Sequence, residues 1–92
     1  MLKQFVIERE VPGIGGSTPA QYCAIAHQSL DVLDAQGAGI QWVESYITDD
    51  KTYCVYRARS EALIREHAAR SGFPVNRIVE VRRVLDPTQA AV

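Results

Sequence analysis

The chain has 92 residues, of which 47% are hydrophobic and 23% are charged, and its formal net charge is −1. A chain of this length forms one domain with a thin hydrophobic core, so we expect residues 1–92 to make a single domain that gains stability from a partner. The near-neutral charge excludes a general nucleic-acid binder, which would carry a basic face. The sequence contains no apolar run of the roughly 18 residues that a membrane span needs, and Met1–Gln4 does not begin a signal peptide. We therefore predict a cytoplasmic protein with no nucleic-acid or membrane partner.

The first half of the chain predicts a strand followed by a helix. Residues 4–10 alternate as a strand does, and the glycines and prolines of residues 11–17 predict a loop. Thr18 is a good N-cap residue, Gln21 completes a capping-box pattern, and Gly37 is typical of a helix end. The inward stripe of this helix is predicted from four residues at helical spacing, Cys23, Ala26, Leu30 and Leu33.

A β-hairpin is the clearest local prediction in the second half. Residues 40–48 and 52–58 are rich in β-branched and aromatic side chains, and residues 49–51 between them predict a short turn. Strict alternation would place three side chains of the first of these strands on one face of the sheet, Trp42, Glu44 and Tyr46.

A second helix and a last strand complete the chain. Ser60 is suited to cap the helix and Gly72 to end it. Its inward stripe is predicted to contain Leu63, Ile64, His67 and Ala68. Residues 76–85 then predict a strand, and residues 86–92 a loosely ordered tail.

The order strand, helix, strand, strand, helix, strand is that of the ferredoxin-like βαββαβ sandwich. The sequence thus predicts an α+β fold with a four-stranded antiparallel sheet and both helices on one face. The open face is predicted to carry Val6, Glu8, Trp42, Tyr46, Glu80 and Arg82. Exposed aromatic residues are costly in water, so we expect two copies to pair through this face as a dimeric α+β barrel.

His67 is the most informative polar residue, because its position points it toward the sheet. A buried imidazole needs a partner for each ring nitrogen. Three interpretations stay open: a core histidine bonded to protein atoms, a general base, or a metal ligand. As a catalytic acid–base group it would act with Glu44 or Tyr46, which could line a polar cavity.

His27 is expected on the exposed flank of the first helix, four residues before Asp31. Residues at this spacing lie on the same face, so the imidazole and the carboxylate form a common two-ligand arrangement for a divalent ion. Cys23 and Cys54 do not form a CxxC pair, and we expect both to be buried thiols.

Four segments, residues 5–9, 41–56, 64–78 and 84–88, together resemble a family of small bacterial proteins of unknown function. That family includes a nickel-binding, nickel-responsive protein. The resemblance implies a ferredoxin-like subunit, a homodimer, and nickel bound at the dimer surface, where histidine and carboxylate side chains are suitable ligands.

The leading hypothesis is therefore a homodimeric nickel-binding or metal-responsive protein without assigned catalysis. Its candidate metal ligands are His27, Asp31 and His67, and no organic cofactor is predicted. An enzyme acting on a small organic molecule, with His67, Glu44 and Tyr46 as catalytic groups, is the first alternative. A non-catalytic interaction module is the second.

Overall fold

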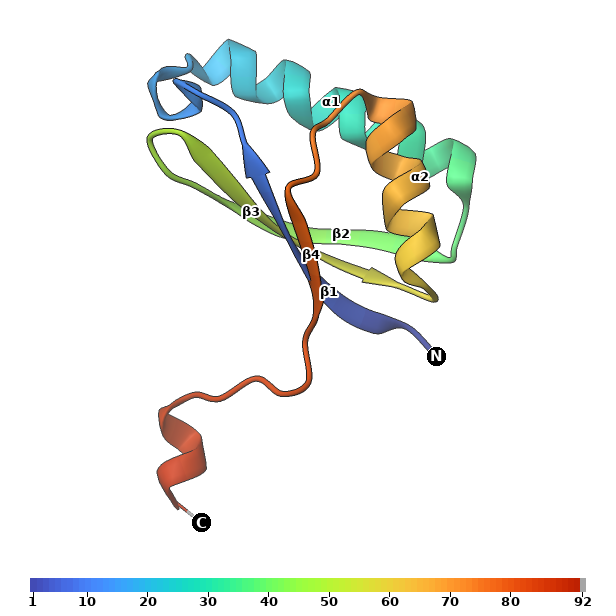
Figure 1. The fold of residues 1–92 in the computed structure, drawn as a ribbon, viewed down its shortest axis with the longest axis vertical. Helices are drawn as coiled ribbons and strands as arrows, with labels where there is room; N and C mark the ends of the chain where they lie inside the picture. Colours follow the sequence, from blue (N-terminus) through green and yellow to red (C-terminus); the bar gives the residue numbers. More distant parts are fainter. Residues whose placement is uncertain (92) are drawn as a thin grey trace.

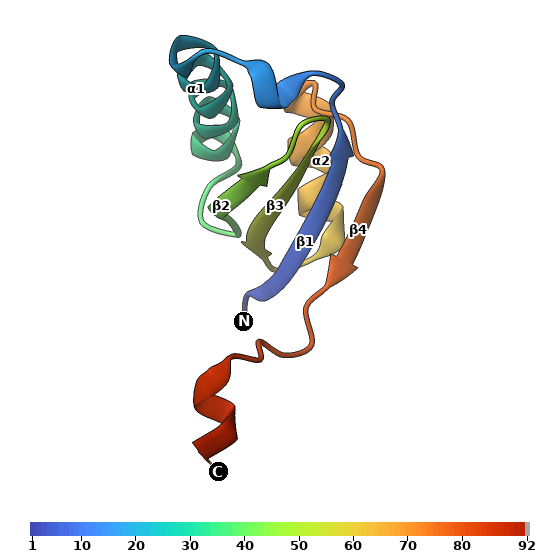
Figure 2. The same ribbon diagram turned by 90° about the vertical axis from the view of Figure 1, so that its left-hand side faces the viewer.

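The computed structural model describes residues 1–91, and it shows a four-stranded antiparallel sheet with two helices on one face (Figure 1 and Figure 2). In chain order the elements are β1 (Lys3–Glu10), the 3-10 helix η1 (Ile14–Gly16), α1 (Pro19–Gln36), β2 (Ile40–Ile47), β3 (Lys51–Ala58), α2 (Glu61–Ser71), β4 (Arg77–Glu80) and the 3-10 helix η2 (Pro87–Ala91). The strand order across the sheet is β2-β3-β1-β4. The predicted ferredoxin-like α+β fold is thereby confirmed.

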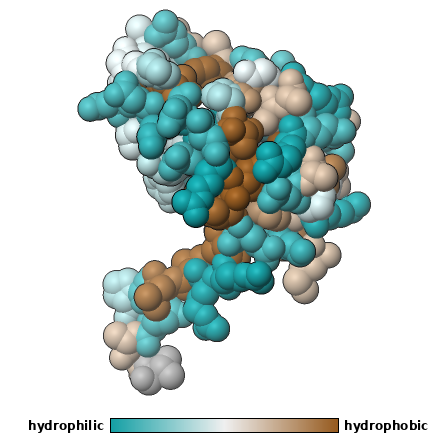
Figure 3. All heavy atoms as spheres, viewed as in Figure 1, coloured by the Kyte–Doolittle hydropathy of each residue, from teal (hydrophilic) through white to brown (hydrophobic). Residues whose placement is uncertain are grey.

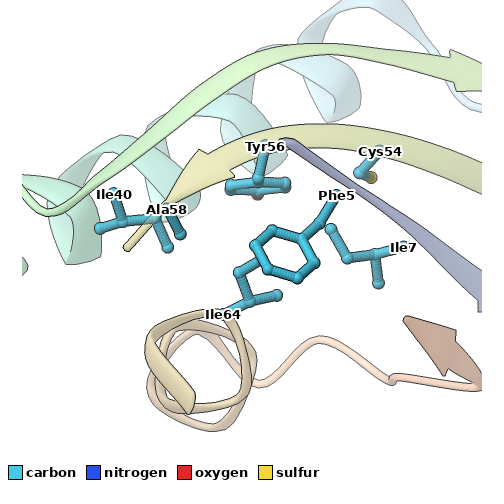
Figure 4. Packing of buried hydrophobic residues seen from close by; sticks show 7 residues of the cluster. All are labelled: Phe5, Ile7, Ile40, Cys54, Tyr56, Ala58 and Ile64. Carbon is cyan, nitrogen blue, oxygen red and sulfur yellow. The ribbon is translucent and has the colours of Figure 1, made fainter. Parts of the chain in front are cut away.

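The hydrophobic core lies between the sheet and the helices. In β1, Phe5 and Ile7 point to the helix side, and Phe5 lies opposite Tyr56 of β3. Figure 4 shows Ile64 of α2 reaching toward these rings. The buried cluster consists of Phe5, Ile7, Ile40, Cys54, Tyr56, Ala58 and Ile64. Ile64 is the member that α2 contributes, so burial of its side chain helps to hold α2 on the sheet.

A β-bulge in β2 overturns the alternation predicted for that strand. Trp42 lies opposite Tyr56 of β3, whereas the next paired residue of β2 is Glu44, so Val43 is left without a partner. An extra residue of this kind reverses the alternation beyond it. Trp42 consequently points to the helix side, and Glu44 and Tyr46 to the open face, so the prediction that the three share a face was wrong.

The last strand is shorter than predicted, since β4 ends at Glu80 rather than at residue 85. Glu80 lies opposite Phe5, which places it at the helix-side edge of the sheet instead of on the open face. Arg82 lies beyond β4 and forms an ion pair with Glu80 at 3.7 Å. The segment after β4 leaves the sheet and leads to η2, away from the body of the molecule (Figure 1).

The helix α1 begins at the predicted residue, but the face that it turns toward the sheet differs from the predicted one. Thr18 and Gln21 form the capping box, with both reciprocal hydrogen bonds present. Cys23 and Leu30 are exposed, however, and Ser29 is buried in their place. The true inward stripe is Tyr22, Ala26, Ser29 and Leu33. The prediction considered apolar side chains only, so it missed the buried polar residue Ser29 and with it the inward face of the helix.

The other predicted helix ends and caps are confirmed, and the cysteine prediction is confirmed for one residue of two. Gly37 ends α1 with a φ of 84°, and Gly72 ends α2 with a φ of 78°. Ser60 occupies the N-cap of α2, although its side chain makes no capping hydrogen bond. Of the two cysteines, Cys54 is buried as expected and Cys23 is not.

Within residues 1–91, neither helix has the length and apolar character needed to cross a bilayer.

Candidate functional site

A cavity of about 530 Å³ lies between α1, the helix-side surface of β2 and β3, and the segment that follows α2. Much of its wall is apolar, with contributions from Val11, Ile14, Tyr22, Ile25, Trp42 and Phe73. Its polar side chains include Arg9, Gln28, Ser29, Ser45, Thr52 and Tyr56. A mostly apolar cavity with a few polar groups is typical of a site for a small organic molecule, and its volume is within the usual range for such sites.

His67 lies directly behind the cavity wall and is fully buried. Its Nε2 atom is 3.1 Å from the Ser29 Oγ and 3.2 Å from the Tyr56 hydroxyl. On the other side of the ring, Nδ1 is 2.9 Å from the Oε1 of Gln36. The predicted orientation toward the sheet is confirmed, and both ring nitrogens have protein partners.

Gln36 determines which nitrogen of His67 carries the proton. The Gln36 amide nitrogen donates to the Leu63 carbonyl at 3.1 Å and to the Glu66 carboxylate at 2.9 Å. The amide oxygen therefore faces His67, and Nδ1–H must donate to it. Nε2 is left as an acceptor with one lone pair, which takes the hydroxyl proton of Ser29 or of Tyr56. These two hydroxyls lie 3.3 Å apart, so one can donate to the other. The network thus holds a neutral imidazole in one tautomer.

Electrostatics favour the same protonation state. Burial, with the nearby Arg9 charge, lowers the pKa of His67 from 6.5 to about 4. Burial also raises the pKa of Tyr56, although the Ser29 hydrogen bond and the Arg9 charge oppose it. Near neutral pH the site therefore contains a neutral imidazole, a neutral phenol and a guanidinium.

Arg9 is the charged member of the cavity wall, and it is only 3% exposed. Its Nη1 donates to the Pro74 carbonyl at 2.7 Å, and the guanidinium carbon lies 5.3 Å from the centre of the Phe73 ring. The Nη2 atom is buried and has no hydrogen-bond partner among residues 1–91. None of the ion pairs in this part of the chain includes Arg9.

The structure does not bring His67 together with Glu44 and Tyr46. The Tyr46 hydroxyl donates to the Glu44 carboxylate, and both residues are exposed on the open face of the sheet. This bond and the Glu44 charge raise the pKa of Tyr46. Because His67 lies on the helix side, these three residues cannot act on one bound molecule in a single subunit.

The three candidate metal ligands are also separated. His27 and Asp31 are exposed on α1, whereas His67 is enclosed and has both nitrogens bonded. Residues 1–91 contain no group of three or more histidine, cysteine, aspartate or glutamate side chains that could hold a metal ion. Since Ni²⁺ normally takes four to six donors, one subunit offers a two-donor surface contact and not a closed metal site.

Several residues of this site were not found from the sequence, among them Arg9, Ser29 and Gln36. Arg9 follows Phe5 and Ile7 at a spacing of two, so strand alternation could have placed it on the inward face. Ser29 and Gln36 are seven residues apart on α1 and share a helix face. A search for apolar stripes excludes such polar residues, although their spacing in the sequence indicates that they share a helix face.

The fold and the cavity define a small ferredoxin-like α+β protein with a pocket between its first helix and its sheet. The family model described as "Nickel responsive protein SCO4226-like" matches residues 5–81. The chain belongs to this SCO4226-like family.

Among solved structures, SCO4226 from Streptomyces coelicolor A3(2) has a similar fold, with a TM-score of 0.74 and 18% sequence identity. The similarity covers 89% of this chain and 99% of that one. At this level of identity the similarity supports the shared fold. No curated protein matches the chain.

Proposed function

We propose that this protein is a nickel-binding, metal-responsive homodimer that carries its metal contact on the outer face of α1. Family membership supports the choice of nickel. The exposure of His27 supports this position, since both ring nitrogens of the other histidine, His67, have protein partners. Asp31 follows four residues later and supplies a carboxylate on the same helix face. Water or a second copy of the chain would complete the coordination.

Calorimetric titration of tag-free protein with Ni²⁺ tests this proposal. The His27→Ala variant should lose binding, and Asp31→Ala should weaken it. The matched control is His67→Gln, which removes the buried histidine and should leave the affinity unchanged once its folding has been verified by circular dichroism. Wild-type binding no tighter than millimolar, or binding that survives His27→Ala, would overturn the proposal.

The homodimer part of the proposal draws on apolar groups that one subunit leaves uncovered. On the open face of the sheet, Tyr46 is 56% exposed and Val79 is 38% exposed. Figure 3 shows a band of hydrophobic residues over β4 that continues into the segment after it, where Val84 and Leu85 are also exposed. A second copy packed on this face would cover a surface that a monomer leaves in water.

Sedimentation velocity tests the pairing. The wild-type chain should sediment as a dimer, and Val79→Lys should shift it toward monomer because a lysine would be buried without a partner. Arg83→Lys, a conservative change at an exposed residue outside the sheet, is the control and should remain dimeric. A monomeric wild type at micromolar concentration would refute the pairing.

A second candidate function is catalysis in the cavity, and one arrangement favours it. The Ser29 hydroxyl, the His67 imidazole and the Gln36 amide form a hydrogen-bonded series, which is the order of a nucleophile, its base and an orienting group. Incubation with a fluorophosphonate followed by mass spectrometry tests it. Labelling of Ser29 that disappears in His67→Gln would support catalysis, and an unlabelled wild type would count against a nucleophilic Ser29.

A further inference from the structure

The strongest unexplained feature of the molecule is the charge of Arg9. A guanidinium that is 3% exposed and lacks a carboxylate partner among residues 1–91 is unusual, because transferring an unpaired charge out of water is costly. Its Nη1 donates to the neutral carbonyl of Pro74, and Nη2 has no hydrogen-bond partner among residues 1–91. The arginine is therefore held in place but is not neutralised.

The groups around Arg9 do not balance the charge of its guanidinium. His67 and Tyr56 are both neutral near pH 7 because burial acts against their charged forms, so neither balances the guanidinium. The nearest acidic residue in sequence on each side, Glu8 and Glu10, belongs to the opposite face of the strand by alternation, and Glu8 is paired with Lys51 at 3.7 Å. The cavity wall named above contains no aspartate or glutamate. A bound anionic ligand would supply the negative charge that these residues lack.

We propose that the cavity binds a small organic monocarboxylate whose anionic end pairs with Arg9 and whose apolar body lies against Trp42, Ile25 and Ile14. A planar guanidinium forms charge-assisted hydrogen bonds with a carboxylate in a geometry that suits both groups. A single negative charge matches the single unpaired cation, whereas a phosphate dianion would leave one charge uncompensated in an apolar site. The hydroxyls of Ser29 and Tyr56, which also line the cavity, can orient a further polar group of the ligand.

This inference does not depend on nickel, because the metal contact proposed above lies on the exposed face of α1 and the cavity on its inner face. Nor does it depend on catalysis, since pairing with Arg9 is a matter of affinity alone. A failure of either proposal above would therefore leave this one standing, and the reverse also holds.

The chain provides its own reporter for a test, since Trp42 is its only tryptophan and lines the cavity. Fluorescence titrations of the full chain would compare 4-phenylbutyrate, its neutral amide and inorganic phosphate. We expect 4-phenylbutyrate to change the Trp42 emission and to bind roughly ten- to a hundredfold more tightly than the amide, as is usual for a hydrogen bond to a charged group. Phosphate should bind more weakly than 4-phenylbutyrate.

Two pairs of variants make the test specific. In Arg9→Met the preference for the carboxylate over the amide should disappear, whereas Arg9→Lys should retain part of it. Ala26→Phe fills the cavity and should abolish binding of both organic probes, whereas Ala24→Phe, on the exposed side of the same helix, should not. Equal affinity of wild-type protein for the carboxylate and the amide would overturn the proposal without reference to any variant, and so would phosphate binding as tight as that of the carboxylate.

Discussion

Acidification should destabilise this protein mainly through one residue, His67. The pKa of its imidazole is about 4 in the folded chain and 6.5 in its ordinary state, so between these values the unfolded chain binds a proton that the folded chain does not. Stability is then fully present above pH 6.5 and falls as the pH approaches 4. The difference of about 2.5 pH units, at about 1.4 kcal/mol each, corresponds to a limit of about 3.5 kcal/mol. About 3 kcal/mol of this is lost by pH 4. A domain of this size has a total stability of about 5–15 kcal/mol.

Urea unfolding at a series of pH values, followed by circular dichroism, measures this loss. The free energy of unfolding should fall by about 3 kcal/mol between pH 6.5 and pH 4, with most of the change assigned to His67. In His67→Gln the absolute stability is lower, because Ser29 and Tyr56 lose a partner, but the fall with acid should be much smaller. His27→Gln keeps the buried ring and should follow the wild type. Parallel curves for the wild type and His67→Gln would refute the reasoning.

Two further predictions concern local structure. A Cβ atom at Gly15 would lie 2.7 Å from the Thr48 carbonyl oxygen, so Gly15→Ala should destabilise the fold by about 1–3 kcal/mol. Gly16→Ala is the control, because no atom outside the adjacent residues lies within 4 Å of the added carbon. Equal melting temperatures for the two variants would contradict the clash. Thr18→Ala removes one half of the capping box and should cost about 1 kcal/mol in urea unfolding, whereas an unchanged midpoint would show that the cap does not contribute.

The fold was predictable because its signals are local and repeated. The capping box at Thr18, the helix-ending glycine Gly72 and the hairpin between β2 and β3 each depend on a few neighbouring residues, and their order along the chain allows few other topologies. The rotation of α1 was not predictable from apolar residues alone. Ser29 is buried because His67, 38 residues away, provides its hydrogen bond, and a stripe search on one helix contains no information about such a partner.

The candidate site was predictable in part, for the same physical reason. His67 could be placed toward the sheet from its helical spacing, but the tautomer-setting role of Gln36 depends on contacts between two helices. The hydrogen bonds that hold His67 in place also occupy both of its ring nitrogens. They therefore count against His67 as a metal ligand. A single sequence shows which side chains can form hydrogen bonds or bind a metal. Only the tertiary structure shows which of these groups are already bonded within the protein and which are free for a ligand.

The bulge in β2 supplies the most direct test of how the cavity is built. Val43 is the residue without a partner in β3, and it is 45% exposed. Deleting it would join Trp42 directly to Glu44 and give a regular ladder in which each keeps its present face. We therefore expect the deletion to be tolerated, with a melting temperature near that of the wild type and with Trp42 still in the cavity wall.

A deletion elsewhere in the sheet should behave in the opposite way. Removing Val55 from β3 would reverse the alternation after it and turn Tyr56 and Ala58, two buried core residues, toward the open face. That variant should fail to fold by circular dichroism. If the Val43 deletion were as damaging as the Val55 deletion, the extra residue would be structurally required in β2, and the register described for this strand would not explain how Trp42 reaches the cavity.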